Sequence, residues 1–220
     1  MSNVDLILGA DPSRKRAVRT EPTQRRSSQR LDALLDAAAE IVDESGFERL
    51  TTQMVAERAG ASIGTVYRYF PDRVAVLHAL RERSVRRFRE RVADELQRAD
   101  LETWWSIIDL TFDVCADMYR EEPGFSVVRG AQRELAEDAV EPELAHRMAR
   151  LIEAEFGGDI DADELRFRLG VAMEFGDALI SRAFDRDEDG DDRYLEEARR
   201  LVHDYLAEHL GSVRDESNAA

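Results

Sequence analysis

The chain has 220 residues, 43% of them hydrophobic, and a formal net charge of −16 at pH 7. This length gives one large or two small domains with enough apolar material for a core, and no apolar run approaches the roughly 18 residues that a membrane-spanning helix requires. The single cysteine, Cys115, excludes an intramolecular disulfide and favours the reducing cytoplasm.

Charge is distributed unevenly along the chain. Residues 1–91 hold 17 basic and 13 acidic residues, a net charge of +4, whereas residues 92–220 hold 14 basic and 34 acidic residues, a net charge of −20. The overall charge argues against DNA binding, but a basic N-terminal part on an acidic remainder directs DNA to one end of the molecule.

Residues 1–26 show no sustained period, are basic, and are interrupted by Pro12 and Pro22. We expect a disordered arm in the free protein. The same arm is suited to order on the DNA backbone or in the minor groove once bound. After it, Ser27 or Ser28 is expected to cap a first helix that ends at Gly46.

Residues 50–73, LTTQMVAERAGASIGTVYRYFPDR, predict two short helices joined by a tight turn. Thr51 or Thr52 caps the first helix, and Gly60 follows it in a position where a left-handed backbone suits glycine. Ser62 caps the second helix, which Pro71 stops at about Phe70. This arrangement is the helix-turn-helix signature of DNA-binding proteins.

One competing motif lies in the same stretch. Gly60-Ala61-Ser62-Ile63-Gly64 fits the G-x-S-x-G nucleophile elbow of α/β-hydrolases. That motif requires a buried strand before the serine, and here a helical pattern precedes it.

The run SIGTVYRYFPDR resembles the recognition helix of the tetracycline repressor (TetR) family of transcriptional regulators, in which Gly-Thr-aliphatic-Tyr-x-aromatic-Phe precedes a basic residue. Gly46-Phe47, Leu50-Thr51-Thr52 and Ala59-Gly60 match upstream, so the resemblance covers about residues 30–80. It implies a helix-turn-helix head on a helical body that binds a small-molecule effector.

Two sets of side chains are expected to contact double-stranded DNA. The base-facing set is Arg68 and Tyr69 with Ile63 and Gly64, because arginine to guanine is the commonest specific pair. The phosphate-facing set is Thr52, Gln53, Thr65, Tyr67 and Arg73. Ser62, at the start of the second helix, is a further expected DNA contact. Packing of Tyr69 against the first helix is the alternative for that residue.

The remainder of the chain predicts an all-α fold of about nine helices. The domain prediction is a head over 27–72, a helical regulatory and dimerisation domain over 73–212, and a disordered tail over 213–220. The arginines of the first helix after the head are expected to form a solvated face. The further helices are expected at about 72–98, 102–120, 125–137, 142–156, 163–184 and 193–210.

The last two helices have apolar faces that are broader than packing against a single core requires. In the resembled family these helices form a two-fold four-helix interface, so we expect a homodimer on a palindromic operator. The expected interface residues are Leu165, Leu169, Ala172, Leu179, Leu195, Leu201, Val202 and Tyr205.

An apolar effector pocket is expected in the body, where the resemblance implies one and where aromatic and sulfur-containing side chains gather along the 102–120 helix. Plain core packing is the alternative for each of them. Asp109, Asp113 and Asp117 recur on one face and indicate a solvated acidic face or, less simply, a site for a cation. The pocket residues are Trp105, Phe112, Cys115, Met118, Tyr119, Met148 and Met173.

Residues 185–196 fit the EF-hand calcium pattern D-x-D-x-D-G-x5-E, but Asp192 and Arg193 occupy positions where an aliphatic residue and an oxygen ligand are wanted. We therefore favour a solvated loop and expect no metal and no cofactor. The four histidines are scattered, and no convincing catalytic set is present, so an enzyme is not expected.

These patterns predict a cytoplasmic, sequence-specific DNA-binding regulator, a repressor released by an unknown small molecule. Two alternatives remain at the level of sequence: a helical ligand-binding or enzymatic protein without DNA binding, and a calcium-modulated interaction protein.

Overall fold

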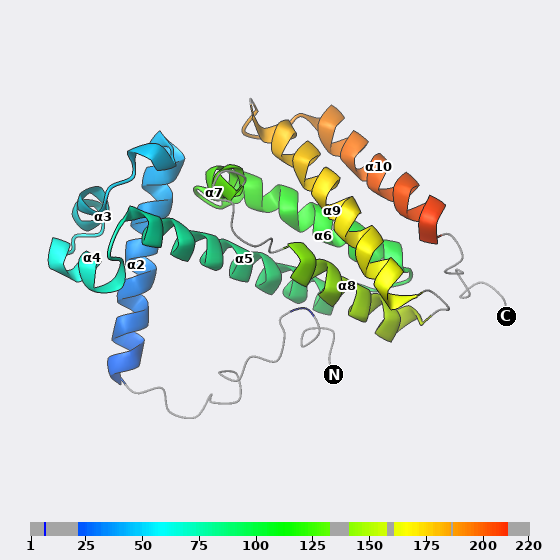
Figure 1. Ribbon diagram of the computed structural model, residues 1–220, viewed down its shortest axis with the longest axis horizontal. Coiled ribbons are helices and arrows are strands. Elements are labelled where there is room, and N and C mark those ends of the chain that lie inside the picture. The colour runs from blue at the N-terminus through cyan, green and yellow to red at the C-terminus, as the bar shows by residue number, and fades with distance from the viewer. Residues whose placement is uncertain (1–6, 8–21, 133–140, 158–160, 186, 211–220) are drawn as a thin grey trace. The chain divides into compact units, whose positions relative to one another are not determined.

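The computed structural model describes Ile7 and residues 22–132, 141–157, 161–185 and 187–210 (Figure 1). Over these residues the chain forms nine α-helices and one 3-10 helix and contains no strand, which confirms the predicted all-α class. The first part of the predicted arm, the end of the predicted 125–137 helix and the C-terminal tail lie outside the described residues. The elements are α2 (Pro22–Ser45), η2 (Phe47–Arg49), α3 (Thr52–Arg58), α4 (Ile63–Tyr69), α5 (Arg73–Arg98), α6 (Trp104–Glu121), α7 (Phe125–Gln132), α8 (Glu141–Phe156), α9 (Ala162–Phe184) and α10 (Asp192–Leu210).

The chain divides into two compact units. The head unit contains the described residues of 22–87 and 121–132, and the body unit contains Ile7, 88–120 and the described residues of 141–210. Helices α5 and α6 each contribute residues to both units. The head unit therefore includes α7 and the first half of α5, which both lie within the predicted regulatory domain of residues 73–212.

The core of the head unit collects the apolar stripe of α2 and the inner faces of α3, α4 and α5. Burial of these side chains removes apolar surface from water, the main driving force for packing short helices. Leu50 is buried between η2 and α3, whereas Phe47 is half-buried. The buried members include Leu34, Leu35, Ala38, Ile41, Val42, Leu50, Val55, Val66, Phe70, Leu77 and Leu80.

The start of α2 differs from the prediction. The predicted cap is Ser27 or Ser28, with Pro22 as an interruption before it, whereas α2 begins at Pro22. Proline suits the first position of a helix because its fixed φ is already helical and its missing N–H would have no partner there. The predicted arm is therefore too long by residues 22–26.

The prediction of a solvated arginine face on α5 is wrong for Arg83. Its side chain is only 2% exposed, and its Nη1 donates to Asp36 Oδ1 of α2 at 2.7 Å. Arg87, one turn further along α5, pairs with Asp36 at 3.6 Å and with Glu122. Burial and the neighbouring Arg87 lower the pKa of the Arg83 guanidinium, while the Asp36 carboxylate opposes that shift.

The turn between α6 and α7 docks on α2 by backbone contacts. Gly124 has φ +73°, and its N–H donates to Asp43 Oδ1 of α2 at 2.9 Å. A Cβ at this position would lie 2.9 Å from the carbonyl oxygen of Ala39. Only glycine therefore permits this approach of the turn to α2.

Helices α8, α9 and α10 pack side by side in the body unit, with α9 in contact with both neighbours (Figure 1). Asp161 caps α9 by accepting from the backbone N–H groups of Asp163 and Glu164. No helix in the described ranges is long and apolar enough to cross a bilayer. The body core includes Val92, Leu96, Trp104, Ile107, Met148, Leu151, Ile152, Leu165, Leu169, Val202 and Leu206.

We predict that Gly124→Ala destabilises the protein more than Gly157→Ala. Both glycines have positive φ, which costs an alanine about 1–2 kcal/mol, but only Gly124 has atoms within 4 Å of the added Cβ. The clash with Ala39 should lower the free energy of unfolding by about 1–3 kcal/mol more. Denaturant unfolding followed by far-UV circular dichroism measures both losses, and equal losses would contradict the close docking.

Candidate nucleic-acid interface

Hydroxyl caps fix the geometry of the two helices around residue 60. Thr51 Oγ1 accepts from the N–H of Met54 at 3.2 Å and caps α3, and Ser62 Oγ accepts from the N–H of Thr65 at 3.1 Å and caps α4. Gly60 has φ +59° in the turn between them. Because α3 is a helix, the strand-turn-helix of a nucleophile elbow is absent here, and the structure excludes the hydrolase interpretation.

The outer face of α4 holds the side chains that were predicted to contact DNA. Tyr67 is 54% exposed, and Gly64 and Arg68 are exposed beside it, whereas Val66 is buried. The structure therefore leaves these side chains open to a ligand on one side of the head unit. Of the other predicted residues, Gln53, Ser62 and Arg73 are exposed, and Thr52, Ile63, Thr65 and Tyr69 are half-buried.

Several of these residues hold each other in place. The Ser62 and Thr65 hydroxyls are 2.9 Å apart, and Gln53 donates to Glu57 at 2.8 Å. Arg73 Nη1 donates to the carbonyl of Glu48 at 3.1 Å, which leaves its other guanidinium donors for a phosphate.

Tyr69 contacts α2, which is the predicted alternative to a base contact for this residue. Its hydroxyl lies 3.0 Å from Ser27 Oγ and 3.4 Å from the Ser27 carbonyl oxygen. The pKa of the Tyr69 phenol is lowered, chiefly by the hydrogen bond with Ser27 and further by Arg68.

An ion pair that sequence reasoning missed joins α3 to α2. Arg58 donates from both terminal nitrogens to Glu44, at 2.9 and 2.7 Å, and also pairs with Glu40 at 3.2 Å. The hydrogen bond with Arg58 lowers the pKa of the Glu44 carboxyl. Glu40 and Glu44 are four residues apart on one helix face, which is the sequence signal that could have indicated a shared cation.

Most of the predicted effector-pocket residues are core side chains in the structure. Cys115, Met118, Tyr119, Met148 and Phe112 are buried, and Trp105 and Met173 are half-buried. Trp105 stacks between neighbours, 3.9 Å from the Trp104 ring and 4.2 Å from the His203 ring.

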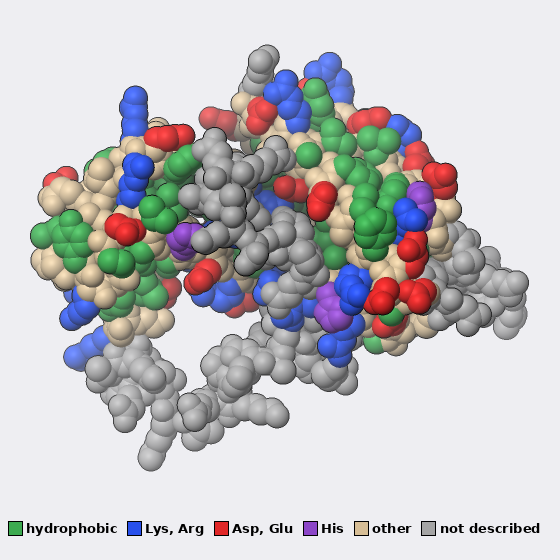
Figure 2. All heavy atoms as spheres, viewed as in Figure 1, with side chains coloured by type: hydrophobic (Ala, Val, Ile, Leu, Met, Phe, Trp, Pro, Cys, Tyr) green, Lys and Arg blue, Asp and Glu red, His purple; other side chains and the backbone are tan. Residues whose placement is uncertain are grey.

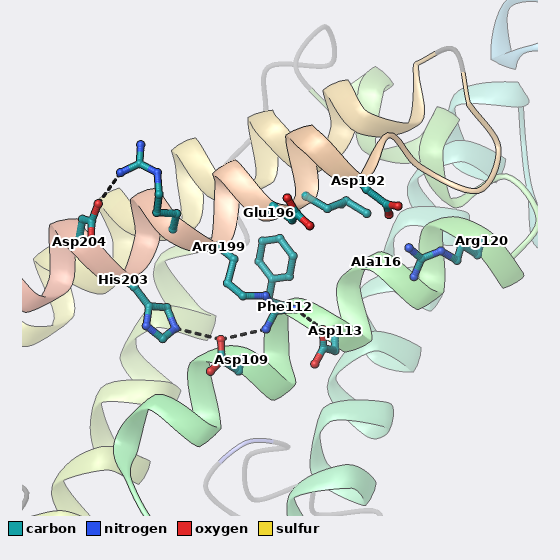
Figure 3. A pocket seen from close by; sticks show the side chains of 12 residues that line it. Asp109, Phe112, Asp113, Ala116, Arg120, Asp192, Glu196, Arg199, His203 and Asp204 are labelled. Atoms are coloured by element: carbon teal, nitrogen blue, oxygen red, sulfur yellow. Dashed lines mark hydrogen bonds and ion pairs between the residues drawn. The ribbon is translucent and has the colours of Figure 1, made fainter.

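A groove of about 540 Å³ lies between α6 and α10, and Phe112 is the one predicted pocket residue that lines it (Figure 3). Arg199 crosses the groove, pairs with Asp109 at 2.9 Å and with Asp113, and lies 4.7 Å from the Phe112 ring centroid. His203 also reaches Asp109, at 2.9 Å. The side chains of Asp109 and Asp113 stay 35% and 61% exposed, in keeping with the predicted solvated face, and Arg199 of α10 pairs with both.

The EF-hand-like loop does not gather its acidic side chains. Asp185 pairs with Arg182 at 2.7 Å, Asp187 accepts from the N–H of Asp189 at 3.1 Å, and Glu196 lines the groove from α10. In the part of the chain that the structure describes, no three histidine, cysteine or acidic side chains come together as metal ligands.

The outer surface of α9 and α10 carries apolar side chains among charged ones (Figure 2). Phe167 is 57% exposed and Tyr194 is 36% exposed, and neither was predicted as an interface residue. Phe167 stands between two arginines and outside the apolar stripe of α9, so the helical period gave no reason to select it. Of the predicted interface set, Leu165, Leu169, Ala172 and Val202 are buried within the chain, and Leu179, Leu195, Leu201 and Tyr205 are half-buried.

Two capped helices across a glycine turn, with exposed hydroxyl and guanidinium groups on the second, define a helix-turn-helix protein of the DNA-binding class. A family model described as bacterial regulatory proteins, tetR family, matches residues 34–80, and one described as tetracyclin repressor-like, C-terminal domain, matches residues 102–210. The chain belongs to the tetracycline repressor family of transcriptional regulators, which are not enzymes. Membership implies an N-terminal DNA-binding domain and a C-terminal domain for ligand binding and dimerisation.

Individual relatives agree with this assignment. A TetR-family transcriptional regulator from Streptomyces coelicolor is 36% identical with a TM-score of 0.72, over 84% of this chain and 99% of that chain. The transcriptional repressors KstR of Mycolicibacterium smegmatis and Rhodococcus jostii are each 35% identical, over 35% and 34% of this chain. The chain matches only about a third of those repressors' own length, 33% and 35%.

We predict that Ser62→Ala lowers the free energy of unfolding by about 1 kcal/mol, because the N–H of Thr65 loses its capping acceptor. Ser126→Ala, an exposed serine in α7 of the same unit, is the matched control and should stay within about 0.5 kcal/mol of the original protein. Chemical unfolding without DNA measures both values. A loss no larger than that of the control would show that the cap does not hold α4.

Proposed function

We propose that this protein is a cytoplasmic transcriptional repressor that binds a palindromic DNA operator as a homodimer and is released by a small-molecule effector. The observation that carries the proposal is the outer face of α4, where Tyr67 and Arg68 are exposed on a helix anchored by its opposite face. The repressor names of the KstR relatives support the direction of regulation.

Within this proposal the predicted contacts fall into two groups by chemistry. Arg68 reads a base edge, because its planar guanidinium can donate two hydrogen bonds to guanine. Thr52, Gln53, Thr65, Tyr67 and Arg73 hold phosphates and set the position of α4 in the groove without reading sequence. The base contacts proposed for Ile63 and Gly64 rest on their place in the first turn of α4.

The homodimer is proposed to form through α9 and α10. An exposed phenylalanine on a surface helix loses apolar contact with water when a second copy covers it. Half-buried Leu179, Leu201 and Tyr205 supply further apolar area, and Phe167 extends the face that the sequence predicted. Two heads held this way would meet half-sites about 34–36 Å apart or a multiple of that distance.

The effector is proposed to bind the body next to α6, where Trp105, Phe112, Cys115, Met118 and Tyr119 lie. Helix α6 continues to Glu121 and leads directly into the turn that docks on α2 through Gly124 and Asp43. The dimer is proposed to have two states, one with the two heads at the spacing that binds DNA and one with the heads further apart. An effector weakens DNA binding by the factor by which it binds the wider state more tightly than the DNA-binding state.

We predict different losses for two arginines of the interface. Arg68→Ala should cost about 1–3 kcal/mol on the preferred duplex and relax the preference at one base position. Arg73→Ala should weaken all duplexes alike and reduce the salt slope by about 1. Sequences selected from random DNA provide the duplexes, and titrations at several salt concentrations measure both effects. Equal losses on every sequence for both variants would refute the assignment.

We predict that light scattering at micromolar concentration gives a mass twice that of the 25.0 kDa chain. Phe167→Glu should shift the protein towards the monomer because it places a charge in the apolar face, and Phe167→Leu, which stays apolar, should not. A 25.0 kDa particle for the original protein, with and without DNA, would contradict the homodimer.

A further inference from the structure

Tyr69 and Ser27 join the last turn of the recognition helix to the N-terminal part of α2. The two residues are 42 positions apart, and their hydroxyl oxygens are 3.0 Å from each other. The Tyr69 hydroxyl also lies 3.4 Å from the Ser27 carbonyl, which can only accept a hydrogen bond. This cross-connection fixes the end of a helix that is only seven residues long.

The hydrogen-bond capacity of a phenol limits what Tyr69 can do for DNA. A tyrosine hydroxyl has one proton to donate, and here either Ser27 acceptor takes it. The side chain is half-buried against α2, unlike the exposed side chains of Tyr67 and Arg68 that precede it. Its geometry therefore suits holding the helix better than reading a base.

Tyr69 also contacts Arg68, the proposed base reader. The Arg68 guanidinium carbon lies 5.4 Å from the centroid of the Tyr69 ring, within the range of a cation–π contact. A ring held by Ser27 restricts the rotamers of the guanidinium before DNA arrives. Such preorganisation reduces the ordering cost at the moment of binding.

We propose that Ser27 and Tyr69 are positioning residues for operator specificity: Ser27 orients the Tyr69 ring, and the ring orients Arg68 towards a guanine edge. This inference rests on the proposed function. It changes the role predicted for Tyr69 from a base contact to a support for the neighbouring base contact, and it assigns Ser27 to the DNA-reading machinery.

The test compares Tyr69→Phe, Ser27→Ala and Ser27→Thr with the original protein. The duplex is one enriched from random DNA by the original protein, and single-base variants of it report the penalty for each mismatch. Arg68→Ala identifies the base position that Arg68 reads. Thermal unfolding of each variant by circular dichroism shows that the head is folded at the temperature of the binding assay.

We expect Tyr69→Phe and Ser27→Ala to reduce the mismatch penalty at the Arg68 position by about 3–10-fold, with the salt slope unchanged, because no phosphate contact is lost. Ser27→Thr retains a hydroxyl and should retain the penalty. The double variant should be no worse than either single variant, since both changes remove one connection.

Three results would overturn the proposal. An unchanged penalty in Tyr69→Phe shows that the hydroxyl does not position Arg68. A changed penalty at a base that Arg68→Ala leaves unaffected shows that Tyr69 reads a base itself, and a uniform loss on all duplexes marks it as a phosphate contact. If the original protein itself enriches no sequence from random DNA, the proposed function is wrong. If the original protein enriches a sequence and only the variants give one of the three results above, the proposed function stands and this inference alone is wrong.

Discussion

Burial of one face of α4 is the constraint on which the interface depends. A helix of seven residues is too short to be stable alone in water, so its structure relies on tertiary packing. Val66 and Phe70 are four residues apart, and both are buried in the head unit at 0% and 3% exposure. Because they occupy one face, Tyr67 and Arg68 between them must face solvent. The same apolar contacts that hold the helix therefore present its polar face to a ligand.

The parts of the head that could be predicted from sequence are those set by local signals. Thr51 and Ser62 cap their helices through N–H groups three residues away, so the prediction of both helices needed no tertiary information.

Arg83 was misassigned because its partner Asp36 is 47 residues distant, and the side chain's burial depends on that pairing. The groove between α6 and α10 was not predicted for the same reason, since its lining comes from helices separated by about 90 residues, as in the Arg199–Asp109 pair. Pro22 shows that a local signal can also be ambiguous. The fixed φ of proline breaks the interior of a helix but suits its first position, so the residue alone does not tell which of the two applies.

The acidic body does not oppose DNA binding by the head at physiological salt. Charges separated by more than about 8 Å of solvent are largely screened there, so a phosphate at α4 responds to its immediate neighbours and not to the net charge of −16. Several body carboxylates are also paired, as in Asp109 with Arg199 and Asp204 with Arg200. Such exposed pairs add little stability, but they remove isolated negative charge from the surface. Negative charge on the body still disfavours contact of the body itself with a duplex.

The docking of the α6–α7 turn on α2 bears on how a signal from the body would reach the recognition helix. Gly124 lies against the backbone of Ala39 with no side chain between them, and the N–H of Gly124 donates a hydrogen bond to Asp43 Oδ1. A contact between two backbones cannot adapt by a change of rotamer, so a shift at the end of α6 must either move α2 or break the contact. Helix α2 in turn carries Ser27, which contacts Tyr69, and Glu44, which contacts Arg58 of α3. In the proposed function, an effector that alters α6 would change both helices of the DNA-binding motif through α2, and by linkage DNA would weaken the binding of that effector by the same factor.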